Sequence, residues 1–162
     1  CLSFAATMTQ PLTKEQFTQL LEPVAKALAA VAVDAADAAA LAERAAPFRG
    51  PAVAALRAAA VAAIPSDWLL PKASAGIRFG RVAKDLHGFS VDAVLMDVPG
   101  PRHRHPNGEL DLCFATSGDP RFDGHPEGWV VYGKGSVHVP TVRGGQMLIL
   151  YFLPGGAIEF GV

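Results

Sequence analysis

The segment PRHRHPNGELDLCF, residues 101–114, places two histidines one residue apart and a glutamate four residues after the second. In an extended strand alternate side chains lie on the same face, so His103 and His105 point the same way. Glu109 and Asp111 can join them on that face after the intervening Pro-Asn-Gly bend. Two imidazoles and a carboxylate on one face can bind a divalent ion, so this segment predicts a metal site.

A third nitrogen ligand must come from elsewhere in the chain, and the segment YGKGSVHVP offers His138 on a strand that follows a tight glycine turn. Imidazole with one carboxylate suits iron, manganese, nickel, copper or zinc, and the ligand set does not choose among them. Coordination positions left open would make the site catalytic rather than structural. The remaining histidines, His87 and His125, lie beside Gly88 and Pro126 and are expected to be ordinary loop residues.

Three further side chains near this segment have simpler expected roles. Asp111 is a candidate for orienting a ligand imidazole by a hydrogen bond, as carboxylates commonly do around metal sites. Cys113 is expected to be a small buried apolar residue. Tyr151 is expected in the core with a hydrogen-bonded hydroxyl, and contact with a substrate ring is the less favoured interpretation.

The second part of the chain has the two-residue alternation and the frequent turn residues that are typical of short β-strands. Alternating runs separated by Gly, Pro and Asp turns occur at residues 76–82, 89–96, 109–115, 128–132, 136–139, 147–153 and 157–160. Turns are expected at 97–100 and 117–120. Seven such strands predict an antiparallel sandwich or barrel. The chain has no glycine-rich nucleotide loop and no Gly-x-Ser-x-Gly motif, which removes two large enzyme classes.

The first part of the chain is rich in alanine and has helical periodicity. Thr13 and Gln16 form a predicted capping box, Pro23 should bend or interrupt the first helix, and Asp34 is the predicted N-cap of a second. A third helix should open at Gly50–Pro51. The predicted fold class is therefore α+β, with a helical region at 1–70, for packing, oligomerisation or covering a pocket, and a β region at 71–162.

The composition excludes several partners. A formal net charge of -1 and a pI of about 6.6 leave no basic surplus for nucleic acid or an anionic membrane surface. No apolar run reaches the roughly 20 residues that a membrane span needs. With only Cys1 and Cys113, a disulfide framework is not expected, and a reducing, cytoplasmic location is predicted. Residues 1–7 lack the features of an export signal, and Met8 is the expected start.

Two segments resemble the sequence motifs of the cupin family. GPRHRHPNGELDLCFATSG, residues 100–118, resembles the first motif, and YGKGSVHVP resembles the second. The spacing after Gly100 is short, and Gly133 stands where proline is usual. The resemblance implies that His103, His105, Glu109 and His138 are metal ligands inside a small cupin-like antiparallel β-barrel or jelly roll.

A closer resemblance covers most of the chain and is strongest over residues 79–124 and 128–160. It is to the 4-hydroxylaminobenzoate lyase family of bacterial nitrobenzoate breakdown. The reaction implied adds water to 4-hydroxylaminobenzoate and yields 3,4-dihydroxybenzoate (protocatechuate) and ammonia. A metal bound by the four ligands would polarise the N–O bond, with Asp111 and Glu109 as the expected catalytic carboxylates. No organic cofactor is implied, because the conversion is redox-neutral.

Other interpretations remain open at this point. Arg78, Arg81 and Arg143 are all possible partners for the carboxylate of a small aromatic substrate. An iron-dependent cupin dioxygenase or oxidoreductase acting on a small aromatic acid would use the same ligands, and a non-catalytic ligand-binding cupin is a third reading. Because cupin barrels commonly pair, a homodimer or larger homo-oligomer is expected.

Overall fold

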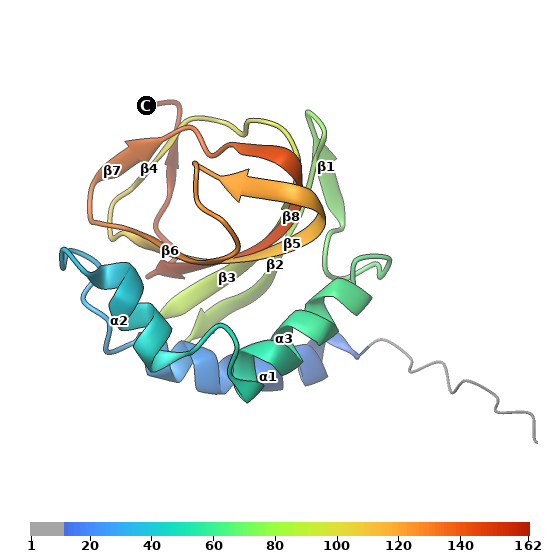
Figure 1. Ribbon diagram of the computed structural model, residues 1–162, viewed down its shortest axis with the longest axis horizontal. Coiled ribbons are helices and arrows are strands. Elements are labelled where there is room, and N and C mark those ends of the chain that lie inside the picture. The colour runs from blue at the N-terminus through green and yellow to red at the C-terminus, as the bar shows by residue number, and fades with distance from the viewer. Residues whose placement is uncertain (1–11) are drawn as a thin grey trace, which may run out of the picture.

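The computed structural model describes residues 12–162, so the predictions about residues 1–7 and Met8 lie outside the described residues. Helices come first along the chain and strands follow, as the sequence predicts (Figure 1). The helices are α1 (Lys14–Leu28), α2 (Ala38–Ala45) and α3 (Pro51–Ala62). The strands are β1 (Lys72–Ser74), β2 (Ile77–Leu86), β3 (Phe89–Met96), β4 (His103–His105), β5 (Glu109–Phe122), β6 (Gly128–Tyr132), β7 (Ser136–His138), β8 (Val142–Pro154) and β9 (Glu159–Phe160).

Helix α1 begins with the predicted capping box. The backbone N–H of Gln16 donates to Thr13 Oγ1 at 3.2 Å, and the backbone N–H of Thr13 donates to Gln16 Oε1 at 2.9 Å. Pro23 does not end the helix, which continues to Leu28. The buried apolar face of the helix on both sides of Pro23 stabilises it against the loss of one backbone hydrogen bond.

The predicted start of the second helix is wrong. Helix α2 begins at Ala38, after Asp37, and Asp34 lies outside it. The side chain of Asp34 instead accepts a hydrogen bond from the backbone N–H of Lys134 at 2.8 Å, 100 residues further along the chain. The side chain that was expected to cap the helix therefore makes a tertiary hydrogen bond instead. Helix α3 begins at Pro51 as predicted.

The strands form two antiparallel sheets. One has six strands in the order β1-β2-β3-β8-β5-β6, and the other has three in the order β7-β4-β9. Each of the seven predicted runs overlaps a strand, although only the last two residues of 157–160 are in β9. The short strand β4 contains the extended His103–His105 segment, and β1 was not predicted. The sheets do not close into one hydrogen-bonded barrel, so the fold is a two-sheet jelly roll of the cupin type.

The predicted turn at residues 117–120 is also wrong, because β5 continues through it to Phe122 and pairs with β8 as far as Val142. The ladder shifts register there instead of reversing. Gly118 pairs with Gly145, and both Gly118 and the neighbouring Gly144 have positive φ. A Cβ on Gly118 would lie 2.5 Å from the carbonyl oxygen of Gly144. Turn-forming residues are thus used for a bulge in a long strand.

The two faces of the six-stranded sheet have different coverings. The helices pack on one face, and the three-stranded sheet lies over the other (Figure 1). Helices and sheet share one core cluster, and Trp129 Nε1 donates to the carbonyl of Ala46 across that contact at 2.7 Å. The division into 1–70 and 71–162 as separate domains stays a prediction.

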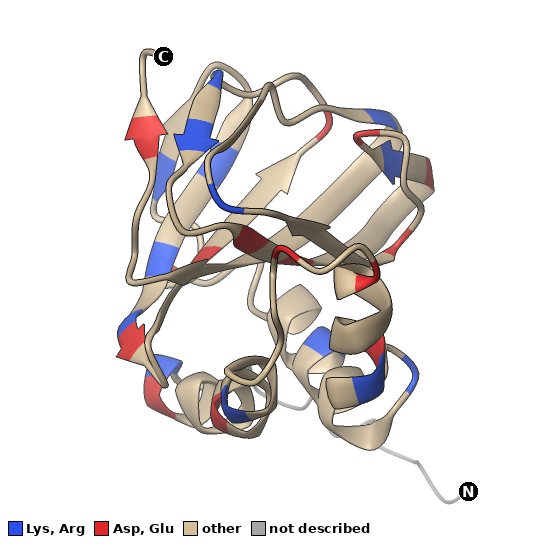
Figure 2. Cartoon of the chain, turned by 90° about the vertical axis from the view of Figure 1, so that its left-hand side faces the viewer, with Lys and Arg blue, Asp and Glu red and all other residues tan. Residues whose placement is uncertain are grey.

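Charged side chains of both signs are interspersed over the molecule, consistent with the small net charge (Figure 2). None of the helices within residues 12–162 is both long and apolar enough to cross a membrane.

Candidate metal centre

The structure brings together the four predicted ligands. His103 and His105 come from β4, His138 comes from β7 directly opposite His103, and Glu109 is the first residue of β5. One ligand atom of each residue lies within 4.8 Å of all the others. The alternation in β4 that places both of its histidines inward is the one expected from the sequence, and Arg104 between them is exposed.

The Nε2 atoms of the three histidines converge on one point. His105 Nε2 lies 2.8 Å from Nε2 of His103 and 2.8 Å from Nε2 of His138. Glu109 Oε2 lies 3.0 Å from His105 Nε2 and 3.6 Å from His138 Nε2. Two of these contacts join nitrogen to nitrogen, an arrangement that a shared cation stabilises better than hydrogen bonds alone.

Contacts behind two of the rings set their orientation. His103 Nδ1 lies 2.9 Å from the carbonyl oxygen of Pro101, and His138 Nδ1 lies 2.8 Å from Oδ2 of Asp123. Each Nδ1 therefore donates outward, and the neutral ring then carries its lone pair on Nε2, toward the centre. This is the pattern found around histidines that bind metals.

The electrostatics of the centre fit a divalent cation. Burial, followed by the effect of neighbouring His105, lowers the pKa of His103 and favours its neutral form. Although burial opposes it, the carboxylates of Asp123 and Glu109 raise the pKa of His138 to about 9. Both carboxyl oxygens of Glu109 are buried; Oε2 faces the imidazole nitrogens of His105 and His138, and Oε1 has no hydrogen-bond partner among residues 12–162. Positive charge at the centre, supplied by a proton or by a metal ion, is needed to offset that burial.

Asp111 lies on β5 two residues after Glu109, on the same face of the strand. It is fully buried, and neither of its carboxyl oxygens has a hydrogen-bond partner in the described part of the chain. Burial, together with the charge of Glu109, raises the pKa of Asp111 well above its usual range and so favours its protonated form. It is not among the described residues that line the adjoining cavity. Asp111 can therefore exchange a proton with Glu109 without contacting a molecule bound in the cavity.

Sequence reasoning missed the residue that supports His138. Asp123 Oδ2 also accepts a hydrogen bond from the Tyr132 hydroxyl at 2.5 Å, and its Oδ1 accepts one from the backbone N–H of Thr141 at 2.8 Å. Asp123 stands in a turn with φ of 48°, outside any strand period. Its Asp-Gly sequence indicates a turn, but no local signal connects it with a histidine 15 residues later.

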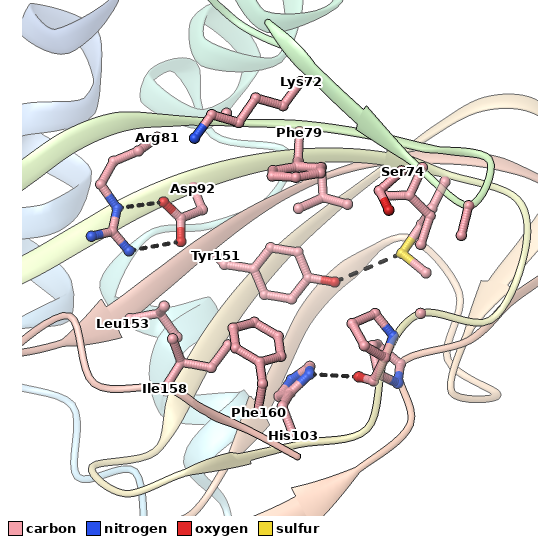
Figure 3. Close-up of a pocket in the computed structure, with 18 of the residues that line it drawn as sticks. Lys72, Ser74, Phe79, Arg81, Asp92, His103, Tyr151, Leu153, Ile158 and Phe160 are labelled. Carbon is pink, nitrogen blue, oxygen red and sulfur yellow. Dashed lines mark hydrogen bonds and ion pairs between the residues drawn. The ribbon is translucent and has the colours of Figure 1, made fainter.

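A cavity of about 860 Å³ lies between the two sheets and reaches His103 and Glu109 (Figure 3). Its walls are mostly aromatic and aliphatic, and Tyr151 lies across its middle. The Tyr151 hydroxyl donates a hydrogen bond to Met96 Sδ at 3.8 Å, and the ring lines the cavity, so the predicted core tyrosine is also a cavity residue. Cys113 is buried and free, as expected. A cavity of this size accommodates a single-ring aromatic acid.

Of the three arginines considered for a substrate carboxylate, the structure places only Arg81 at this cavity. Arg78 donates to the carbonyl oxygen of Ile64 at 3.1 Å. Arg143 pairs with Arg121 in the bulged part of the β5–β8 ladder. Neither Arg78 nor Arg143 is among the described residues that line the cavity. Lys72, which the sequence did not single out, lies at the cavity rim with Arg81.

A jelly roll that carries three histidines and a glutamate beside an internal cavity places this chain in the cupin class. Residues 19–160 match the family described as PnbB, 4-hydroxylaminobenzoate lyase, and the chain belongs to this family.

Two curated relatives bear the same name. The chain is 34% identical over 94 residues to the 4-hydroxylaminobenzoate lyase of Nocardioides sp. (strain LMS-CY), covering 52% of this chain and 55% of the relative. It is 31% identical over 88 residues to that of Pseudomonas putida, covering 44% and 50%. The chain thus spans about half the length of the curated relatives it matches.

The chain is also similar to solved structures of other proteins. The DMSP lyase DddQ from Ruegeria pomeroyi DSS-3 aligns with a TM-score of 0.45 at 19% identity, over 66% of this chain and 67% of that one. An RmlC-like cupin protein from Ralstonia eutropha JMP134 aligns with a TM-score of 0.39 at 16% identity, over 58% and 62%.

Proposed function

We propose that this protein is a 4-hydroxylaminobenzoate lyase acting in nitroaromatic catabolism. The reaction converts 4-hydroxylaminobenzoate and water to 3,4-dihydroxybenzoate and ammonia, with no net oxidation. The observation that carries the proposal is the convergence of His103, His105, Glu109 and His138 at the end of a cavity of the right size for an aromatic acid. Membership of the family supports the choice of substrate.

In this proposal the four converging residues hold a divalent metal ion, which is iron, manganese, nickel, copper or zinc. When bound there, the ion supplies Lewis acidity at the end of the cavity. The fit rests on three facing Nε2 atoms, on the outward hydrogen bonds of two of the rings, and on the buried carboxylate of Glu109.

The other side chains have distinct tasks. The walls of the cavity, including Phe79 and Tyr151, contact the aromatic ring and exclude bulk water from it. Glu109 is the carboxylate that reaches the cavity, and Asp111, two residues further along β5, has a raised pKa that favours its protonated form. Departure of the hydroxylamine oxygen and attack of water each require a proton transfer, and this buried carboxyl pair can hold and return that proton.

The decisive experiment incubates the purified protein with 4-hydroxylaminobenzoate while ammonia, the catechol product and dissolved oxygen are measured, with elemental analysis of the same sample. The proposal predicts equal amounts of ammonia and 3,4-dihydroxybenzoate without oxygen uptake. Oxygen consumption in step with turnover would instead identify a dioxygenase or oxidoreductase acting on an aromatic acid. Tight binding without any product would identify a ligand-binding cupin.

A matched pair of variants tests the assigned centre. His105→Ala removes a buried ligand and should abolish both metal binding and turnover while the far-ultraviolet circular dichroism stays native. His125→Ala makes the same change at an exposed loop position and should leave both unchanged. Full activity of folded His105→Ala would refute the assigned centre.

The predicted homodimer or larger assembly and the cytoplasmic location stay predictions. Light scattering on the purified protein and fractionation of the producing cells would check them.

A further inference from the structure

The rim of the cavity carries a charged cluster of Lys72, Arg81 and Asp92, away from His103 (Figure 3). The sheet register explains why these side chains meet there. Lys72 pairs with Phe79, and Arg81 pairs with Asp92. Directly paired residues project from the same face of a sheet, and here that face lines the cavity.

The charges of this cluster do not cancel. Arg81 Nε lies 2.8 Å from Asp92 Oδ1 and a terminal guanidinium nitrogen lies 3.2 Å from Oδ2, so Asp92 occupies one side of the guanidinium in a two-point contact. Lys72 has no ion-pair partner among residues 12–162. With two cations and one anion, the cluster has a net charge of about +1 and is suited to an anion.

The cluster and Glu109, which is the centre residue on the six-stranded sheet, lie on the same face of that sheet but on different strands. Arg81, Asp92, Tyr151 and Asp111 are successive partners across β2, β3, β8 and β5. Three strand spacings of about 4.8 Å separate Arg81 from Asp111, roughly 14 Å between backbones. That distance leaves room for one aromatic ring over Tyr151, between a cation reaching in from the rim and Glu109 at the other end.

We propose that Lys72, with Arg81 fixed beside it by Asp92, binds the carboxylate of a benzoate ligand and so aims its para substituent at the His103–Glu109 end. The identity of the reacting group rests on the proposed function, but the carboxylate site does not. Lys72 is a specificity residue in this assignment. It selects aromatic acids over neutral aromatic compounds of the same shape, and it favours a para arrangement because the anion and the reacting group bind at opposite ends.

Calorimetric titration of the purified full chain with 4-aminobenzoate and with its neutral methyl ester tests the site directly. Lys72→Gln should weaken binding of 4-aminobenzoate by about fivefold and leave binding of the ester unchanged, because only the acid forms a charge-assisted contact. Lys72→Glu should weaken binding of the acid further. Lys84→Gln, an exposed lysine on β2 away from the cavity, is the matched control and should behave as wild type.

Equal affinity of Lys72→Gln and Lys84→Gln for the acid would overturn the proposal, and so would an equal loss for acid and ester. Turnover of 4-hydroxylaminobenzoate separates this result from the lyase assignment. Binding of the acid that depends on Lys72, without ammonia release, would support the carboxylate site and refute the lyase. Ammonia release with neither KM nor binding changed in Lys72→Gln would support the lyase and refute the site.

Discussion

The carboxylate of Asp123 lies 2.8 Å from Nδ1 of His138, so it faces the candidate metal centre through the imidazole of a proposed ligand rather than directly. The same oxygen of Asp123 accepts a hydrogen bond from the Tyr132 hydroxyl. The hydrogen bond to Asp123 thus fixes the orientation of the His138 ring. The hydrogen bonds that Asp123 accepts from Tyr132 and from the backbone of Thr141 hold the carboxylate itself in position. Asp123 is a positioning residue, and its effects should appear first in metal binding.

Asp123→Asn should weaken metal binding by about tenfold to a hundredfold, because the amide keeps the shape of the side chain but loses the charge that favours a cation-binding imidazole. Competition of the purified protein against a chelator measures this affinity without relying on turnover. Asp119→Asn, an exposed change on β5, the strand that ends just before Asp123, should have no effect. Unchanged metal affinity in folded Asp123→Asn would show that the contact does not support the centre.

Metal affinity should increase with pH. Because the pKa of His138 is raised to about 9, its ring holds a second proton at neutral pH that an incoming ion must displace. The apparent affinity should therefore rise about tenfold per pH unit from neutral pH to near the His138 pKa, where the proton is already lost. Calorimetry in buffers of different ionisation enthalpy should count about one proton released per ion at pH 7. A count near zero would contradict this assignment.

Asp111→Asn should lower kcat by at least about a hundredfold while the fold is kept, because a neutral amide replaces a neutral acid of the same size but cannot exchange its proton. Turnover and circular dichroism together check this. A catalytically normal Asp111→Asn would exclude Asp111 from the reaction.

The same variant should change how stability depends on pH. The pKa of Asp111 is raised in the folded protein, so folding takes up a proton above the ordinary Asp pKa, and its contribution to stability falls as pH rises through that range. Asp111→Asn removes this loss. In denaturant titrations of chelator-treated proteins, the free energy of unfolding of the variant should therefore rise relative to that of the wild type as the pH is raised from 4 to 8. A parallel pH dependence in the two proteins would contradict the assigned protonation state.

Residues 71–162 should not fold without the helices. The helix-facing side of the six-stranded sheet is made of large buried side chains, which are Leu110, Leu112, Phe114, Leu148, Leu150 and Phe152. Exposing a Leu or Phe costs about 1.5–3 kcal/mol each, so the six together cost on the order of 10 kcal/mol, comparable to the whole stability of a domain. Size-exclusion chromatography and circular dichroism of the segment would check this, and cooperative unfolding of a monomer would show two independent domains instead.

A milder version of this test keeps the whole chain. Leu56→Ala in α3 should lower the free energy of unfolding by about 2–5 kcal/mol, because Leu56 is fully buried in the core that helices and sheet share. Val61→Ala, at a largely exposed position in the same helix, should cost much less.

The parts of the site that could be predicted from sequence are those that depend on local geometry. His103 and His105 alternate in one short strand, so covalent geometry alone turns both the same way, and motif spacing adds Glu109 and His138. The capping box of α1 and the limits of β3 and β6 were predicted for the same reason.

Only the tertiary structure decided which segments far apart in the sequence contact each other, because no local sequence pattern links them. Asp34 binds Lys134 instead of capping a helix, and Asp123 reaches His138 from a separate turn. Lys72 comes to the cavity through an additional edge strand, whereas Arg78 and Arg143 do not reach it. Strand and helix periods repeat over two to four residues and can be read along the chain. The position of one sheet over another depends on the packing of the whole core, so only the folded protein determines which distant side chains meet.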